Sequence, residues 1–281
     1  MILQWEFLLA VGLLGMLAGV LAGLLGVGGG LLIVPALIVI FGWQGVDGSV
    51  IAHAAIGTSL ASIIATSISS ARAHHAHGAV NWQRVKQLSA GLFVGSLAGA
   101  LFAGELETGM LQLVFGLFAI SVSFQMWFRP KVVYQKTMPG RKGMNLAGMF
   151  IGAVSGIVGI GGGSMTVPFL TWHGVSIRQA VATSSACGLP IAMAGFAGFV
   201  ISGWSSVMMP QYSWGYVHLP TLLIISLLSV LMAPLGARLA HKLPVVQLKR
   251  IFAVLLLVIG VKLTDVLNMP LNILLNLLAS P

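Results

Sequence analysis

Two runs of three consecutive glycines could expose backbone N–H groups to a bound anion. They are Gly28, Gly29 and Gly30 in the first half of the chain and Gly161, Gly162 and Gly163 in the second half. Glycine adopts positive φ and other backbone conformations that side chains forbid. An apolar run restarts after each cluster, so we expect a helix to begin there, with unpaired N–H groups at the positive end of its dipole. Such a helix end binds anions.

Close approach between helices is the alternative role for these glycines. We assign packing to the glycines that recur every fourth residue ahead of each cluster, and interpret the triple glycines as an anion site in preference to a packing device. The packing set is Gly15, Gly19 and Gly23 in the first half and Gly148, Gly152 and Gly156 in the second half. Neither cluster has the spacing of a dinucleotide-binding fingerprint or the lysine of a P-loop.

Hydroxyl side chains occupy matching positions in the two halves and could donate hydrogen bonds to an anion without carrying charge. Ser and Thr in apolar helices also bond their own backbone or a neighbouring helix, so ligand contact and a structural role are both open. Ser164 and Thr166 replace Leu31 and Ile33 of the first half, which makes the second cluster the more polar one. The candidate hydroxyl residues are Thr58, Ser59, Ser164, Thr183, Ser184 and Ser185.

The two glycine clusters belong to an internal repeat. The segment GLLGVGGGLLIVPAL at 23–37 resembles GIVGIGGGSMTVPFL at 156–170, at a constant offset of 133 residues. Both segments lie in long apolar stretches, and non-helical backbone at membrane depth is tolerated only where it is buried in protein or lines a cavity. Paired apolar segments interrupted by Gly and Pro therefore indicate the binding site of a transporter built by duplication.

Composition independently indicates a membrane protein. Hydrophobic residues make up 58% of the chain and charged residues only 7%, against about 25% charged residues in soluble domains. The formal net charge is +9, but the basic residues fall between apolar segments, so we assign them to membrane orientation and expect no nucleic-acid partner. One cysteine, Cys187, excludes an internal disulfide and a thiolate metal cluster. The start of the chain lacks a cleavable signal pattern, so we expect Met1 onward to be retained.

The apolar stretches are long enough to cross a bilayer as helices. The two that contain the triple glycines, 6–42 and 145–174, could each cross once or go out and back. If each crosses twice, 13 of the 14 Lys and Arg residues fall on one side, whereas single crossings give a 9:5 division. The positive-inside rule therefore favours two crossings. The remaining stretches are 48–71, 87–104, 108–128, 179–203, 217–237 and 245–264.

Five crossings in each half predict an all-α polytopic membrane protein made of two inverted-topology repeats with glycine-broken helices. An odd number of crossings makes the second repeat enter the membrane upside down relative to the first. We expect residues 1–128 to form the first repeat, 129–144 a cytoplasmic linker, and 145–281 the second repeat, with a short C-terminal half-helix at 268–279. Both termini are then expected on the outer face.

The remaining polar residues give little support to other chemistries. No Asp or Glu falls in the middle of an apolar stretch, which disfavours a carboxylate proton relay or a cation site and favours an anionic substrate. His74, His75 and His77 lie in a basic loop, where solvated side chains are more usual than a metal site. We expect no catalytic residues, no metal and no cofactor. A membrane enzyme or assembly factor would need a nucleophile–base pair or metal-ligand spacing, and the apolar stretches have neither.

Together these motifs resemble the sulfite exporter TauE/SafE family. The resemblance rests on the paired glycine motifs, each followed by Val-Pro, on the two Thr-Ser stretches, and on Gly236-Ala-Arg before Leu243-Pro. It covers nearly the whole chain. It implies a multi-pass permease of the bacterial inner membrane that exports sulfite or a small organosulfonate, which would make the outer face periplasmic.

We therefore expect a secondary transporter in the lipid bilayer that exports a small anion by alternating access between two repeats. An anion channel of the same fold is the alternative, because no coupling residue is evident. Flux that saturates and is trans-stimulated would indicate the carrier, and ohmic current would indicate the channel. The sequence leaves open the identity of the anion, the coupling ion and assembly into a homo-oligomer.

Overall fold

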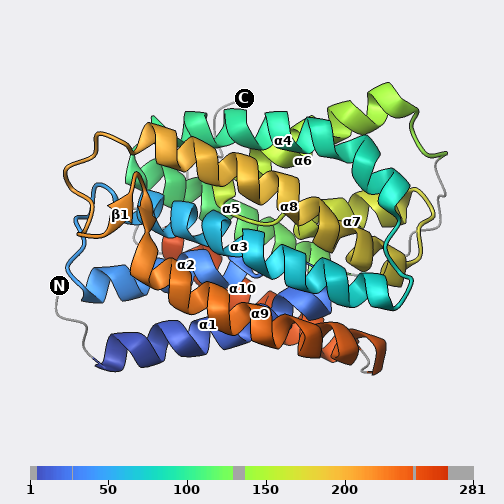
Figure 1. The fold of residues 1–281 in the computed structure, drawn as a ribbon, viewed down its shortest axis with the longest axis horizontal. Coiled ribbons are helices and arrows are strands. Elements are labelled where there is room, and N and C mark those ends of the chain that lie inside the picture. The colour runs from blue at the N-terminus through green and yellow to red at the C-terminus, as the bar shows by residue number, and fades with distance from the viewer. Residues whose placement is uncertain (1–4, 27, 129–136, 243–244, 265–281) are drawn as a thin grey trace, which may run out of the picture.

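The computed structural model describes residues 5–26, 28–128, 137–242 and 245–264, and these fold almost entirely into helices, as predicted (Figure 1). The first half contains α1 (Trp5–Leu25), α2 (Gly30–Trp43), α3 (Ile51–Ala76), α4 (Trp82–Gly104) and α5 (Thr108–Trp127). The second half contains α6 (Arg141–Val158), α7 (Gly163–Trp172), α8 (Ile177–Ser202), α9 (Leu219–Lys242) and α10 (Val245–Leu263). A hairpin of β1 (Ser213–Trp214) and β2 (Val217–His218) precedes α9. The predicted half-helix at 268–279 and residues 129–136 of the predicted linker lie outside the described residues, and the last four residues of that linker already belong to α6.

Length and apolar character together distinguish the helices that could span a membrane. Six described helices, α1, α3, α4, α5, α8 and α9, are long and apolar enough to cross a membrane. α2 and α7 have only 14 and 10 residues, because each starts at a glycine cluster inside an apolar stretch. The Asn81 side chain caps α4 by accepting the Arg84 N–H group, whereas α2 and α7 start without a side-chain cap. Their first N–H groups are therefore left for another partner.

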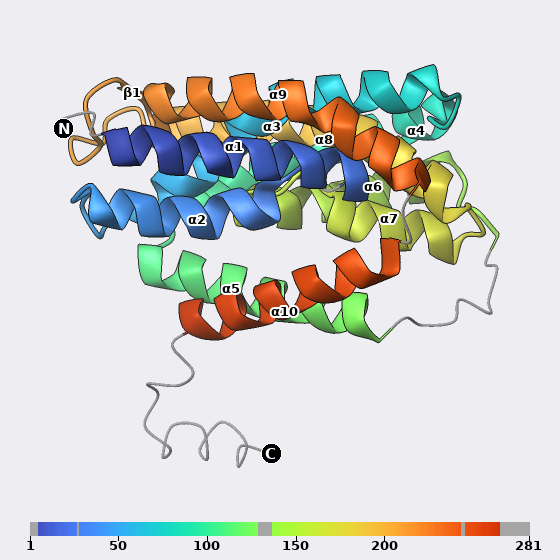
Figure 2. The ribbon, with the colours of Figure 1, turned by 90° about the horizontal axis from the view of Figure 1, so that it is seen from below.

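The helices run back and forth between two ends of the bundle (Figures 1 and 2). After each glycine cluster the chain turns back, so that α2 returns beside α1 and α7 returns toward the start of α6 (Figure 2). The α2–α3 connection and the β hairpin lie at the end where α1 begins, whereas the α3–α4 and α7–α8 connections lie at the other end (Figure 1). α1 and α6 therefore point in opposite directions.

Contacts between helices follow the same scheme in both halves. α1 packs along α9 and α6 packs along α4, while α3 packs on α8 and α5 packs on α10 (Figure 2). If each helix is replaced by its counterpart in the other half, five helices away in chain order, the same four pairs are obtained; for example, α1–α9 becomes α6–α4. Each half thus packs mainly against the other half, and α3 and α8 are the most buried of the spanning helices.

Stripes of glycine make close helix contacts, and their predicted packing role is confirmed. A Cβ added at Gly15 would lie only 3.0 Å from the Ile225 Cα atom. The partners on α9 and on α4 are related by one constant offset, so the two seams match residue by residue. On α1 the contacts are Gly15 with Ile225, Gly19 with Ser229 and Gly23 with Ala233, and on α6 they are Gly148 with Leu88, Gly152 with Leu92 and Gly156 with Ser96.

Basic residues gather at one end of the bundle, as the sequence predicted. We call the end that holds the α3–α4 and α7–α8 connections the basic end. Lys262 and the described acidic residues, Glu6, Asp47, Glu105 and Glu107, belong to the opposite end. This division matches the one that favoured two crossings for each glycine-containing stretch. The described basic residues at the basic end are Arg72, Arg84, Lys86, Arg141, Lys142, Arg178, Arg238 and Arg250.

Replacing Gly23 by alanine is expected to destabilise the protein, because the added Cβ would overlap the Ala233 carbonyl oxygen. Gly156→Ala should behave alike, since its Cβ would overlap the Ser96 carbonyl oxygen. We expect each variant to lower the free energy of unfolding in detergent by about 1–3 kcal/mol. Gly109→Ala is the control, because a Cβ there meets nothing within 4 Å. Equal stability of all three variants would contradict the packing seams.

Candidate functional site

Both triple-glycine clusters interrupt a helix, as predicted. α2 begins at the last glycine of the first cluster, and α7 begins at the last glycine of the second. The chain ahead of each new helix takes left-handed backbone conformations that side chains rarely adopt. The positive φ angles are 68° at Gly26, 75° at Gly28 and 82° at Gly29 in the first break, and 79° at Gly159 and 73° at Gly162 in the second.

The two helices that follow the breaks begin with the same hydrogen bond. The Ile33 N–H group donates to the Gly29 carbonyl oxygen at 3.1 Å, and the Thr166 N–H group donates to the Gly162 carbonyl oxygen at 2.7 Å. At the second break, no described backbone carbonyl accepts the N–H groups of residues 161–164. These four N–H groups lie at the positive end of the α7 dipole and are available to a ligand.

The two breaks touch each other inside the protein. A Cβ added at Gly28 would lie 3.2 Å from the Gly161 Cα atom, and one added at Gly30 would lie 2.5 Å from the Gly159 carbonyl oxygen. Every glycine of both clusters is buried. Only glycine allows the two turns to approach this closely, so the clusters bring the start of α2 and the start of α7 to one place.

Two of the predicted hydroxyl residues stabilise the breaks across the two halves. Ser59 Oγ donates to the Gly159 carbonyl oxygen at 2.9 Å, and Ser184 Oγ donates to the Gly26 carbonyl oxygen at 3.0 Å. Each serine lies in one half and satisfies a buried carbonyl of the break in the other half. The two bonds are equivalent under exchange of the halves, and both hydroxyl hydrogens are used by protein.

The other hydroxyls chosen on α3 and α8 also have protein partners. Thr58 Oγ1 accepts the His218 N–H group at 3.0 Å, and Thr183 Oγ1 accepts the Asn81 N–H group at 3.1 Å. Ser185 Oγ donates to the carbonyl of its own helix one turn earlier and accepts from Ser70 Oγ at 3.2 Å. Direct contact between these residues and a ligand therefore stays a prediction, and in this conformation they join elements of the fold.

A different set of hydroxyls is buried without a hydrogen-bond partner among the described residues. Ser164 and Thr166 belong to it, as the polarity of the second cluster indicated, and Ser155 and Ser67 join them. All four side chains are at least nine-tenths buried. A buried polar group without a partner costs free energy, so such a cluster calls for an explanation.

These hydroxyls surround the second break. A Cβ added at Gly162 would lie 3.5 Å from both Ser155 Oγ and Thr166 Oγ1. On α8, a Cβ added at Gly188 would lie 2.5 Å from Ser67 Oγ and 3.3 Å from the Gly161 carbonyl oxygen. Hydroxyl donors and free N–H groups thus converge on one buried stretch of backbone, and no Asp, Glu, Lys or Arg is buried among the described residues.

Sequence reasoning missed Ser155 and Ser67. Ser155 could have been found, because it aligns with Ala22 at the offset of the repeat and so adds a hydroxyl only in the second half. Ser67 is likewise a hydroxyl in one half only, since it aligns with Ala192 at the offset that relates Thr58 to Thr183, but its place beside the second break could not be predicted. It lies on α3, in the other half of the chain, and only the packing of α3 on α8 brings it beside Gly188 and Gly161.

The histidines at the end of α3 contact different partners. His74 Nε2 lies 2.9 Å from the Gly23 carbonyl oxygen, and the Trp82 Nε1–H group donates to His75 Nδ1 at 3.1 Å. Within the described part of the chain, no group of three or more His, Cys, Asp or Glu side chains could hold a metal ion. Three adjacent histidines in sequence therefore do not make one cluster in space.

Comparison with known proteins relates nearly the whole chain to one family. The chain matches the model of the family described as sulfite exporter TauE/SafE over residues 11–263. A probable membrane transporter protein of Haemophilus influenzae is 38% identical, with 92% of this chain and 99% of that protein aligned. A probable membrane transporter protein of Methanocaldococcus jannaschii is 28% identical, with 92% and 97% aligned. No solved structure gives a significant match.

Removing the bonds between the halves should destabilise the protein to a similar extent from either side. Ser59→Ala and Ser184→Ala each leave a buried carbonyl oxygen without its hydroxyl donor. We expect each variant to lower the free energy of unfolding in detergent by about 1–3 kcal/mol. Ser121→Ala is the matched control, because its exposed hydroxyl bonds only its own helix. Variants as stable as the control would show that these bonds do not hold the breaks.

Proposed function

The chain belongs to the sulfite exporter TauE/SafE family, and on this premise we propose that it exports a small oxyanion, sulfite or an organosulfonate, across the bacterial inner membrane by alternating access. The family and the apolar helices make the chain a multi-pass membrane transporter. The proposal concerns the substrate, the direction of transport, the inverted repeat and the binding site.

Matched interactions support two inverted repeats. The α1–α9 and α6–α4 seams, the Ser59 and Ser184 hydrogen bonds and the Thr58 and Thr183 hydrogen bonds are each reproduced when the halves are exchanged. The opposite directions of α1 and α6 agree with five crossings per half (Figure 2). In transporters of this kind the substrate site lies where broken helices of the two repeats meet.

The unpartnered donors around the second break carry the assignment of an anion site. Residues 161–164 offer backbone N–H groups, and Ser155, Ser164, Thr166 and Ser67 offer hydroxyls, all of them buried. An oxyanion accepts hydrogen bonds through every oxygen and would satisfy several of these groups at once. The helix dipole of α7 adds a favourable potential for negative charge. A cation would find no carboxylate there.

Burial of both breaks supports a carrier in preference to a channel. A channel needs a continuous path past its selective site, whereas here Gly28 and Gly161 are in contact and enclosed by protein. Transport would require the two halves to move relative to each other and open the site to one face at a time. Neutral donors suit such a cycle, because they bind an anion weakly enough to release it.

Thr166→Val should weaken transport without weakening the fold. Valine keeps the shape of threonine and removes a buried hydroxyl that has no described partner, so the free energy of unfolding should not fall. Loss of one donor to the substrate should raise the apparent KM for sulfite in proteoliposomes roughly 2- to 12-fold. Thr171→Val is the matched control on the same helix, because its hydroxyl bonds its own backbone.

An unchanged KM in Thr166→Val, or an equal increase of the KM in Thr171→Val, would show that the Thr166 hydroxyl does not bind the substrate. Competition by a neutral sulfur compound of the same size would contradict the anion preference itself. Ohmic current in place of saturating flux would favour the channel.

The proposed orientation predicts which connections can be labelled from outside. In a Cys187→Ala background, Gly48→Cys and Gly140→Cys form a matched pair, since a Cβ at either position meets nothing within 4 Å. An impermeant thiol reagent should label Gly48→Cys in intact spheroplasts and Gly140→Cys only after lysis, because Gly140 precedes α6 at the basic end. The reverse pattern would overturn the orientation.

A further inference from the structure

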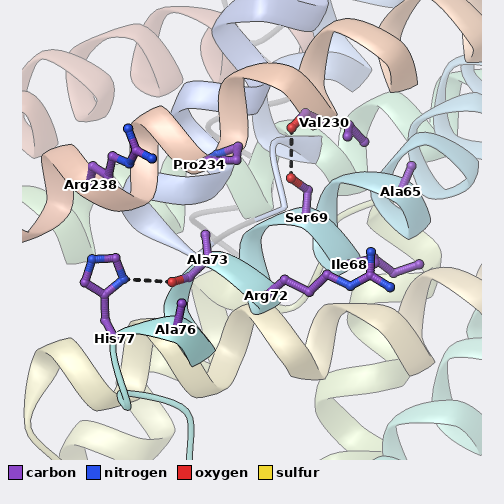
Figure 3. A pocket seen from close by; sticks show the side chains of 10 residues that line it. All are labelled: Ala65, Ile68, Ser69, Arg72, Ala73, Ala76, His77, Val230, Pro234 and Arg238. Carbon is purple, nitrogen blue, oxygen red and sulfur yellow. Dashed lines mark hydrogen bonds between the residues drawn. The ribbon is translucent and has the colours of Figure 1, made fainter.

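A groove of about 560 Å³ opens between α3 and α9 toward the basic end, and none of its lining residues belongs to a glycine break (Figure 3). Its inner part is apolar, formed by Ala65, Ile68, Val230 and Pro234. The hydroxyl of Ser69 lies in this part but donates to the Val230 carbonyl oxygen at 2.8 Å, so it closes the floor and offers no hydrogen to a ligand. The groove is therefore an apolar slot along two helices.

Basic side chains line the outer part of the same groove. Arg72 comes from the last turns of α3 and Arg238 from the last turns of α9, so the two helices that form the walls each contribute one guanidinium group (Figure 3). His77 lies at the end of α3 beyond them and bonds the Ala73 carbonyl oxygen at 2.8 Å. Among the described residues no acidic side chain lines the groove, and the described acidic residues lie at the opposite end of the bundle.

The helix pair that matches α3–α9 when the halves are exchanged is α4–α8, which packs more closely and carries no charge at the matching positions. At the α4–α8 contact, Gly198 lets α4 approach so that an added Cβ would lie 2.6 Å from Ala100 Cβ. The matching position on α3 is Ala73, whose methyl group lines the groove. Ala197 and Leu101 stand where α3 and α9 carry the two arginines. The groove and its charge thus distinguish α3–α9 from its counterpart.

This combination fits a lipid better than a free anion. A small oxyanion needs several donors around it, whereas the floor of this groove is apolar and its one hydroxyl is already bonded. Arg72 and Arg238 are exposed near helix ends, where a membrane protein meets lipid headgroups, and Ile68 lies on the exposed side of α3. Basic grooves between helices on the cytoplasmic side suit anionic headgroups.

We propose that the α3–α9 groove binds one anionic phospholipid, with the phosphate held by Arg72 and Arg238 and an acyl chain lying along Ala65, Ile68 and Val230. The lipid would fill the gap that Ala73 leaves between the two helices, and would link the outer helix α9 to the central helix α3. This site is separate from the proposed anion site and does not depend on which substrate is transported.

Lipid binding to the purified full-length protein tests this proposal. Delipidated protein in neutral detergent would be titrated with phosphatidylglycerol and, separately, with phosphatidylcholine, and bound lipid counted by native mass spectrometry. We expect phosphatidylglycerol to bind at least about fivefold more tightly, and Arg72→Gln with Arg238→Gln to remove that preference. Arg141→Gln with Arg178→Gln is the matched control, since both arginines are exposed at the basic end but do not line the groove.

A second variant tests the apolar part of the groove. Ala65→Phe should fill the slot and lower phosphatidylglycerol binding while both arginines remain, and a melting temperature close to that of the unmodified protein would show that the fold survives. Equal binding of the two lipids, or an equal loss of binding in the two double-arginine variants, would overturn the proposal. So would unchanged phosphatidylglycerol binding in Ala65→Phe, particularly if inorganic phosphate competes for the arginines, because the groove would then hold a free anion.

Discussion

Irregular backbone inside a bilayer has to be covered and hydrogen-bonded by protein, and this constraint governs both glycine breaks. Each break contains a buried turn carbonyl, and a serine of the opposite half donates a hydrogen bond to it. Ser59 donates to Gly159, and Ser184 donates to Gly26. Neither half could satisfy its own break in this way. The exchange of hydrogen bonds therefore helps to hold both breaks at one place, between the glycine seams that pack α1 along α9 and α6 along α4.

The two halves share a scaffold but differ in chemistry. The matching residues of the second half place Ser155, Ser164 and Thr166 where the first half has Ala22, Leu31 and Ile33. Both breaks keep the glycines that the turn requires, whereas the hydroxyl donors without partners gather at the second break. The two helix pairs that join the halves also differ, because the α3–α9 pair forms a groove lined by two arginines and the α4–α8 pair packs closely.

Much of the frame could be predicted from the sequence, because it depends on local rules. Glycine runs end helices, glycines at every fourth residue let helices approach, and basic residues sort to one side of a membrane. The site was predicted less completely. Thr58, Ser59, Thr183 and Ser184 were candidate ligand contacts from their matching positions, but the structure gives each a protein partner, and the place of Ser67 beside the second break had no signal in the sequence. These roles depend on contacts such as Ser184 with Gly26, between residues 158 positions apart in the chain.

The position of a bound heavy oxyanion would show whether the substrate site lies at the second glycine break. Selenite has the charge and shape of sulfite and a selenium atom with strong anomalous scattering. An experimental structure of the protein with selenite should show an anomalous peak within hydrogen-bonding distance of the backbone N–H groups of residues 161–164, beside Ser155 and Thr166. A reproducible peak elsewhere in the protein, with this position empty at saturating selenite, would contradict the account and leave the triple glycines a role in packing alone.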